Sequence, residues 1–387
     1  MDDVIVIGAG PVGNHLALKL SKLGHQITVL EQQDEVAQTV CCTGILSKDC
    51  LEAFPLPGEF ILREAFSASI YSPSGKILRV EKQTPQAYII ERRAYQRWLA
   101  EQAQQRGVRY ITGCPVSNIH IDKDKAKVEI STGILESRTV VVASGIGSGL
   151  VRRLGLDDLT DFTIGAQAEV ASQVNEVELY SGREIAPGFF AWLVPTSPGR
   201  ALAGLFCRQQ ANLYLKNLLD RLYQQGKIAS PEATPSYKRV PLGPLSRTYR
   251  PRMLLVGEAA GQVKPTTGGG IYYGLICADI ATDVLHQAFS SGDFSARHFS
   301  HYQKEWKRRL GREIRIGRFA RGLYQRLGDR QIDHIFSLAQ ADGIHQALLN
   351  SPDFSFDWHG ELILKALKYK ALYGVLQLGR IPFRKRS

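Results

Sequence analysis

The first thirty-one residues constrain the fold of this chain more than any other stretch. Residues 4–7 are a short β-branched run, which predicts a buried strand. A glycine-rich turn follows at once, and residues 14–22 then show helical periodicity before Gly24 ends the helix. A second apolar run over 27–30 ends in an acidic residue. This order of strand, glycine turn, helix, strand and acid predicts a dinucleotide-binding βαβ unit.

Each residue type in this opening motif has a physical task. The first glycine turns the chain, the second lets a pyrophosphate approach the backbone, and the third lets the helix pack on the sheet. The helix N-terminus offers free N–H groups and a positive dipole end to the phosphates. A carboxylate at the end of the second strand can hold a ribose hydroxyl. The candidate cofactor-binding residues here are Gly8, Gly10, Pro11, Val12, Gly13 and Glu31.

The composition is typical of a globular protein without metal-site cysteines or a membrane-spanning segment. The hydrophobic content of 44% and charged content of 22% are ordinary for a globular enzyme of 387 residues. Six cysteines are scattered without zinc-site spacing, so we expect free thiols and no metal. The chain has no run of eighteen apolar residues, and Asp2 and Asp3 stand where a signal peptide would be basic, so we expect a cytoplasmic protein.

The net charge of +11 is concentrated near the C-terminus. From Lys304 onward there are seventeen Lys and Arg residues against eight Asp and Glu. Leu364 and Leu367 fall at helical spacing with Lys365 beside them, and Arg380, Arg384, Lys385 and Arg386 follow. We expect this segment to contact an anionic membrane peripherally, although a helix packed on the body explains the pattern equally well. Nothing accompanies the charge that indicates nucleic-acid binding.

A second set of glycines lies far along the chain. An apolar run over 139–143 ends near Gly145, and another over 253–256 ends in Gly257 and Glu258. The Glu258 carboxylate can accept hydrogen bonds from polyol hydroxyls. A triple glycine then opens a predicted helix over 271–288, where the backbone can approach a flat ring and the positive helix end can stabilise an anionic reduced flavin. This segment must meet the opening motif if both bind one flavin, and we expect it to do so. It adds Gly145, Gly257, Glu258, Gly268, Gly269, Gly270 and Ile271 to the cofactor-binding candidates.

The middle of the chain has a different pattern. Short runs with period-two alternation recur over 161–206, which predicts an antiparallel sheet, and residues 208–230 look largely helical. Residues 60–80 predict two more strands around a turn at 72–75. Residues 94–105 predict a helix, 108–111 a strand, and 117–131 a hairpin. Residues 40–46 look too irregular for a strand, and the last eighty residues look mainly helical.

Taken together, these motifs resemble the FAD-dependent oxidoreductases of the para-hydroxybenzoate hydroxylase-type fold, and within them the geranylgeranyl reductase family. The family's cysteine–glycine stretch is matched by residues 42–45, and its Tyr-x-Trp-x-Phe-Pro box by residues 190–195. The match covers roughly residues 1–290. This chain departs from the family pattern at four positions: Glu258 stands in place of Asp, Thr43 in place of Gly, Phe190 in place of Tyr and Val194 in place of Phe. The resemblance therefore supports flavin binding more strongly than it identifies the substrate.

The resemblance implies a fold and a domain order. We expect an α/β chain (α+β overall) with a Rossmann-like FAD-binding domain, mainly parallel, formed by 1–60, 88–158 and 248–300. An antiparallel substrate-binding domain is expected from 61–87 and 159–247. A helical, basic C-terminal segment follows over 301–387.

The resemblance also implies site residues and chemistry. It places Cys42 over the flavin with Gly44 nearby, and Arg92 at a helix start that contacts the cofactor; a solvated ion pair with Glu91 is the alternative for Arg92. Family members saturate isoprenoid double bonds, which we expect to require protonation of the alkene, hydride from the flavin and a dry apolar slot. Candidates for catalysis are Cys42, Trp192 and Tyr272, and candidates for lining the slot are Phe189, Phe190, Trp192, Tyr272 and Tyr273.

Three functions remain open from the sequence. The leading hypothesis is a reductase of prenyl chains on a lipid, quinone, chlorophyll precursor or prenyl diphosphate. The alternatives are a flavin monooxygenase or halogenase of the same fold, and a flavoprotein that only binds or senses. The chain contains no second strand–glycine–helix unit for a nicotinamide, so the reductant is either NADPH bound transiently or a ferredoxin-type donor.

Overall fold

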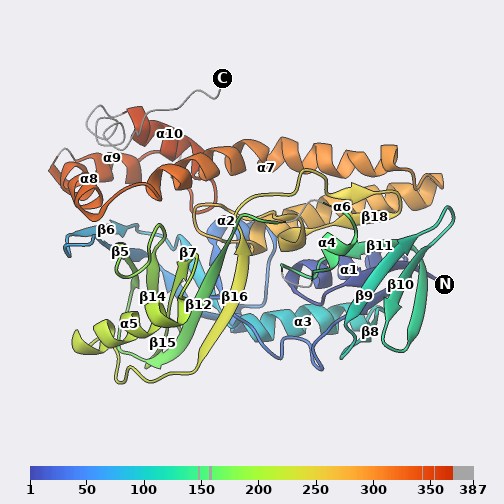
Figure 1. The fold of residues 1–387 in the computed structure, drawn as a ribbon, viewed down its shortest axis with the longest axis horizontal. Coiled ribbons are helices and arrows are strands. Elements are labelled where there is room, and N and C mark those ends of the chain that lie inside the picture. The colour runs from blue at the N-terminus through green and yellow to red at the C-terminus, as the bar shows by residue number, and fades with distance from the viewer. Residues whose placement is uncertain (147–148, 157–158, 342, 353, 369–387) are drawn as a thin grey trace. The chain divides into compact units, whose positions relative to one another are not determined.

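A computed structural model describes residues 1–146, 149–156, 159–341, 343–352 and 354–368 (Figure 1). The chain folds into two compact units. Unit 1 is formed by residues 1–42, 91–162 and 239–314, and unit 2 by 43–90, 163–238 and the described residues from 315 onward. The basic residues predicted at 380, 384, 385 and 386 lie outside the described residues.

Unit 1 is built on a sheet whose central strands are parallel. Within the described chain six strands run in the order β17–β18–β11–β1–β2–β8, and β10 and β9 extend β11 as an antiparallel ribbon. The β-branched residues of β1 are fully buried between helices, as expected for a parallel strand. The strands are β1 (Asp2–Ile7), β2 (Ile27–Leu30), β8 (Arg109–Ile111), β9 (Val116–Ile121), β10 (Ala126–Ile130), β11 (Gly133–Val142), β17 (Tyr249–Arg250) and β18 (Met253–Leu255).

The helices of unit 1 position the glycine turns. Helix α1 begins at Pro11, whose fixed φ suits the first helical position, and ends before Gly24, which adopts a φ of +84°. It packs against both α3 and α6. The helices are α1 (Pro11–Lys22), α3 (Arg92–Gln104), α4 (Leu150–Arg153) and α6 (Ile271–Ser291), with a 3₁₀ turn η2 (Gly257–Ala260).

Unit 2 contains an antiparallel-rich sheet and a small second sheet. The larger sheet has the order β16–β12–β15–β14–β13–β5–β6, and the smaller one β3–β7–β4. Ile45–Ser47 is a short strand, contrary to the sequence prediction, because its backbone pairs with β7 far along the chain. The strands are β3 (Ile45–Ser47), β4 (Ile61–Ala65), β5 (Ser67–Tyr71), β6 (Ile77–Glu81), β7 (Ala87–Ile90), β12 (Phe162–Ala171), β13 (Val177–Tyr180), β14 (Ala191–Pro195), β15 (Arg200–Cys207) and β16 (Pro235–Pro241).

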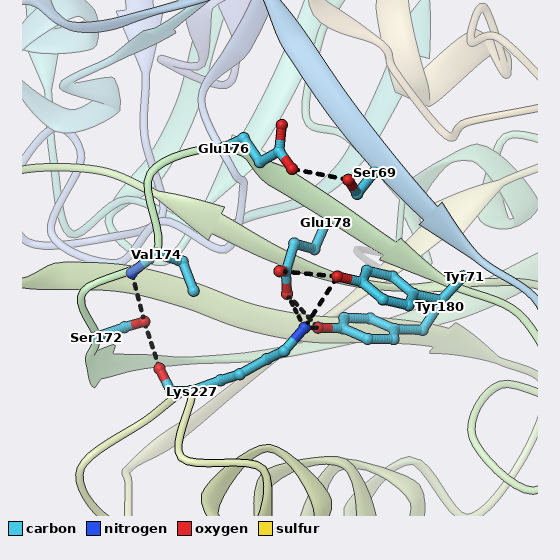
Figure 2. A network of polar contacts seen from close by, with 8 residues as sticks. All are labelled: Ser69, Tyr71, Ser172, Val174, Glu176, Glu178, Tyr180 and Lys227. Carbon is cyan, nitrogen blue, oxygen red and sulfur yellow. Dashed lines mark hydrogen bonds and ion pairs between the residues drawn. The ribbon is translucent and has the colours of Figure 1, made fainter. Parts of the chain in front are cut away.

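The two faces of the larger sheet differ in character. Val177 and Leu179 of β13 point into an apolar cluster, whereas Glu178 and Tyr180 point to the other face. There, Figure 2 shows Lys227 between Glu178, Tyr71 and Tyr180, with its ammonium 2.8 Å from the Glu178 carboxylate. The helices of this unit are α2 (Lys48–Ala53), α5 (Ala211–Gln224), α8 (Asp329–Ala341), α9 (Ile344–Leu349) and α10 (Gly360–Lys368), with a 3₁₀ turn η1 (Gly58–Phe60).

Helix α7 (Ala296–Tyr324) continues from the last segment of unit 1 into that of unit 2. Thus the described part of 301–387 does not form a compact unit of its own, and residues 43–60 belong to unit 2 rather than to the parallel sheet. Among the described helices, none combines the length and apolar character needed to cross a membrane.

Candidate functional site

In the glycine turn after β1, two glycines lie against neighbouring backbone and a third has open space beside it. A Cβ on Gly8, whose φ is +107°, would lie 2.6 Å from the carbonyl oxygen of Ala143, and one on Gly13 would lie 2.0 Å from that of Gly8. A Cβ on Gly10 would have no described atom within 4 Å. Gly8 and Gly13 therefore serve packing, and Gly10 leaves the space a ligand's phosphates need.

The peptide between the first two glycines is held by buried side chains. The N–H of Ala9 donates to the Glu31 carboxylate at 2.8 Å, and its carbonyl accepts from the side chains of Asn14 at 3.0 Å and Gln96 at 2.7 Å. All three side chains are buried. The turn is thus preorganised by the protein, because its backbone groups already have fixed partners.

This support includes residues that sequence reasoning missed. Asn14 also donates to the backbone carbonyl of Gln96 and accepts from the Tyr110 hydroxyl at 3.0 Å. Burial raises the pKa of Tyr110, so this phenol remains a donor. The available signal was a polar residue directly after the glycine motif, at a position of α1 whose other buried residues are glycine or apolar.

The glycine turn after β1 and the second glycine-rich segment, which runs from Gly257 to the start of α6, meet at Val12. A Cβ on Gly257 would lie 3.2 Å from both Cγ atoms of Val12, and one on Gly274 would lie 2.4 Å from its Cγ2. This contact confirms the expectation from the sequence that the two distant segments come together. Val12 therefore contacts both the turn after β18 and helix α6.

Glu258 lies between two further glycines. Its Oε1 is 3.1 Å from the position of a Cβ on Gly270, and its Oε2 is 3.7 Å from that of a Cβ on Gly145. Gly270 is the N-cap of α6, which begins at Ile271, and Gly268 adopts a φ of +70°. One carboxylate, two glycine turns and a helix N-terminus are thus gathered at the carboxyl ends of parallel strands, where ligands bind in open α/β sheets.

Arg92 is the first residue of α3 and is not the solvated partner of Glu91. The Glu91 carboxylate instead caps the helix by accepting from the N–H of Ala94. The Nε and Nη1 atoms of Arg92 are buried and have no hydrogen-bond partner among the described residues. Two buried guanidinium nitrogens without a partner are costly, which points to an anionic ligand.

The aromatic candidates of unit 2 form one cluster. The Trp192 ring lies 4.9 Å from Phe206 and 6.0 Å from Phe190, between ring centroids, and its indole N–H is buried with no hydrogen-bond partner in the described chain. A Cβ on Gly204 would lie 2.6 Å from Cζ2 of Trp192, so this glycine makes room for the indole. Phe206 was missed, although strand alternation places it on the same face as Gly204.

Comparison with known proteins decides the family. The family model described as FAD dependent oxidoreductase matches residues 3–68 and 45–235. The chain belongs to the FAD-dependent oxidoreductases. It is 30% identical to the digeranylgeranylglycerophospholipid reductase 2 of Methanothermobacter thermautotrophicus, over 86% of this chain and 90% of that one.

Solved structures agree with this assignment. A geranylgeranyl bacteriochlorophyll reductase-like protein from Thermoplasma acidophilum superposes on this oxidoreductase with a TM-score of 0.84 and 25% identity, covering 98% of this chain and 99% of the other. A halogenase crystallised with FAD has a TM-score of 0.67 and 14% identity, covering 94% and 85% of the chains, and shows a shared fold alone.

The residues of this FAD-dependent oxidoreductase fit the cofactor of its family. Gly10 leaves open space, Arg92 offers two unpartnered nitrogens for an anion, and Glu258 offers a carboxylate to hydroxyls. Within the described residues, no group of three or more His, Cys, Asp or Glu side chains is placed to hold a metal.

The remaining predicted residues are placed but keep only predicted roles. Cys42 is half-buried. Gly44 adopts a φ of +72°, and a Cβ there would lie 2.5 Å from the Ile90 carbonyl oxygen, so both its backbone conformation and the packing in the small sheet require glycine. Tyr272 is half-buried and Tyr273 buried on the first turn of α6, and Phe189 is buried beside β14. The catalytic and slot-lining roles of these residues stay predictions.

Proposed function

We propose that this oxidoreductase uses FAD to reduce carbon–carbon double bonds in the isoprenoid chain of a lipid. The observation that carries the proposal is the meeting of both glycine segments at Val12, with the Glu258 carboxylate beside Gly270 and two buried, unpartnered nitrogens on Arg92. The names of the relatives indicate the substrate class, a geranylgeranyl chain on a glycerophospholipid.

Residues of unit 1 hold the cofactor in this proposal. The backbone around Gly10 and the guanidinium of Arg92 bind the pyrophosphate, and the Glu31 and Glu258 carboxylates accept hydrogen bonds from hydroxyl groups. The triple glycine ending at Gly270 lets the backbone of α6 approach the ring. When bound and reduced, FAD supplies the hydride.

The aromatic cluster of unit 2 is the surface that we propose for the prenyl chain. The cluster of Phe190, Trp192 and Phe206 is apolar, with Trp192 buried and both Phe side chains partly buried, which suits a prenyl chain and limits access of water. Excluding water protects a carbocation formed by protonation of the alkene. We assign Cys42 the role of controlling access to the flavin or relaying a proton there.

A single anaerobic experiment tests the proposed reaction. Enzyme reduced with dithionite, freed of excess reductant and mixed with a digeranylgeranyl glycerophospholipid should regain the oxidised flavin spectrum without oxygen, and mass spectrometry should show the lipid gaining two mass units for each bond reduced. A monooxygenase, halogenase or binding module would leave both the spectrum and the lipid unchanged. Repeating the reduction step with NADPH, and then with a reduced ferredoxin, identifies the electron donor.

Peripheral membrane contact is part of this proposal, because the substrate is a lipid. Lys304, Arg308 and Arg312 are exposed at four-residue spacing on α7, and so share one face of that helix. Such a row suits an anionic lipid surface. Co-sedimentation with anionic but not neutral liposomes, weakened by changing the three residues to Gln or by deleting residues 380–387, would support this; equal binding to both liposomes would contradict it.

A further inference from the structure

Lys264 is a buried lysine inside the glycine-rich loop that precedes α6, with 5% of its surface exposed. The loop closes on itself through two backbone hydrogen bonds. The N–H of Lys264 donates to the carbonyl of Gly269 at 2.9 Å, and the N–H of Gly268 donates to the carbonyl of Lys264 at 2.8 Å. The backbone of the lysine is thus fixed directly beside the triple glycine.

The side chain of Lys264 occupies the space that Gly269 leaves. A Cβ on Gly269 would lie 2.6 Å from Cε and 3.2 Å from Nζ of the lysine. The ammonium therefore lies against the glycine backbone rather than in solvent. Lysines are almost never fully buried unless they serve an interaction, because burying the charge is costly.

Two opposite charges lie beside adjacent glycines of the loop. The ammonium of Lys264 lies beside Gly269, and the carboxylate of Glu258 lies beside Gly270. The sequence predicts that this glycine run approaches a flat ring but carries no signal for the lysine. A fixed cation beside a low-dielectric ring site acts on the charge state of the ring more strongly than it would in water.

We propose that Lys264 tunes the FAD electrostatically by stabilising its reduced, anionic form. Uptake of two electrons and one proton from a donor leaves one negative charge on the ring, which a neighbouring ammonium favours. The inference rests on the proposed binding of FAD at the triple glycine. Lys264 accordingly raises the midpoint potential of the bound flavin and eases its reduction.

Four variants test this role by the midpoint potential of the bound FAD, measured anaerobically against reference dyes. Lys264→Met keeps the approximate length of the side chain without its charge and should lower the midpoint potential. Lys264→Arg keeps the charge, and its midpoint potential should stay close to that of the wild type. Gly269→Ala should also lower the potential, because the new methyl displaces Cε of the lysine while Gly269 has no left-handed φ. Lys22→Met, an exposed change of equal net charge on α1, is the matched control and should leave the potential unchanged.

The double variant separates an electrostatic role from a structural one. If the methyl of Gly269→Ala acts by moving the ammonium, adding it to Lys264→Met should lower the potential no further. A wild-type potential in Lys264→Met overturns the proposal; if that variant fails to bind FAD, a wild-type potential in Gly269→Ala does so instead. No prenyl substrate enters the measurement, so its outcome is independent of whether the enzyme reduces isoprenoids.

Discussion

The Glu31 carboxylate accepts a 2.8 Å hydrogen bond from the backbone N–H of Ala9 and a 3.0 Å bond from that of Gln33. The residue predicted to hold a ribose therefore also fixes the glycine turn that we propose receives the pyrophosphate. Both tasks use the same ionised group, since a carboxylate has lone pairs for more than one donor. Glu31 is therefore both a candidate ligand-binding residue and a structural support of the glycine turn.

Glu31→Gln should weaken FAD binding. Hydrogen bonds to charged groups contribute about 1.5–3 kcal/mol, so we expect a loss of about tenfold or more in affinity. Titrating apoprotein into FAD and following the quenching of flavin fluorescence measures the dissociation constant. Glu35→Gln removes an exposed carboxylate from the following loop and should have no effect. Equal affinities in the two variants would contradict the role of Glu31.

Asn14→Leu should destabilise unit 1 as well as weaken FAD binding. The change leaves the Tyr110 hydroxyl without its acceptor and removes donors from the carbonyls of Ala9 and Gln96. Each unsatisfied buried group costs about 1–3 kcal/mol, so we expect a loss of about 3 kcal/mol in the free energy of unfolding. Urea denaturation measures it, and Gln104→Leu on the exposed face of α3 is the control. A loss no larger than that of the control would show that water replaces the amide.

Val12 and Asn14 differ in how well the sequence predicts their roles: the position of Val12 follows from the glycine motif, whereas the buried hydrogen bonds of Asn14 do not. Glycines and apolar periodicity follow local rules, so the parallel βαβ opening, the antiparallel middle and the meeting of the glycine segments could be predicted. Asn14, Gln96, Lys264 and Phe206 owe their roles to contacts with residues distant in the chain or to the closure of a loop. A polar side chain carries no local signal that it will be buried, so these supports became visible only in the fold.

Lys227→Met should destabilise unit 2. Lys227 donates to Glu178 and to the Tyr71 and Tyr180 hydroxyls, and burial together with Glu178 raises the pKa of Tyr180, which stays a donor. Removing the ammonium leaves the Glu178 carboxylate, whose side chain is 10% exposed, without its counter-ion. We therefore expect a loss of about 3 kcal/mol in the free energy of unfolding. Adding Glu178→Gln should recover part of this loss, and the exposed Lys216→Met should cost little. A double variant less stable than Lys227→Met alone would refute this account.

His25 should make the enzyme less stable at mildly acidic pH. Burial is the main cause that lowers its pKa from the model-peptide value of 6.5, with His286 and Arg138 acting in the same direction and Asp3 opposing them. The unfolded chain therefore takes up a proton that the folded chain resists. Its contribution to stability is present above pH 6.5 and is lost as the pH falls below it. Urea denaturation at pH 7.5 and 5.5 should show a smaller pH-dependent loss in His25→Gln than in the wild type, whereas the exposed His120→Gln should behave like the wild type. An unchanged pH dependence in His25→Gln would refute the assignment.

Cys42→Ala should separate cofactor binding from turnover. Cys42 is half-buried, directly before the segment in which Gly44 enters the small sheet, and the substitution removes only a thiol. If the thiol controls access to the flavin or relays a proton, the variant should keep its yellow FAD complex and its affinity for FAD while losing most of its reductase turnover. Cys41→Ala, a change of equal size at the adjacent half-buried thiol, is the matched control and should retain turnover. Anaerobic reoxidation of reduced enzyme by the prenyl lipid gives the rate for both variants; a wild-type rate in Cys42→Ala would remove this residue from the mechanism and leave proton transfer to another group.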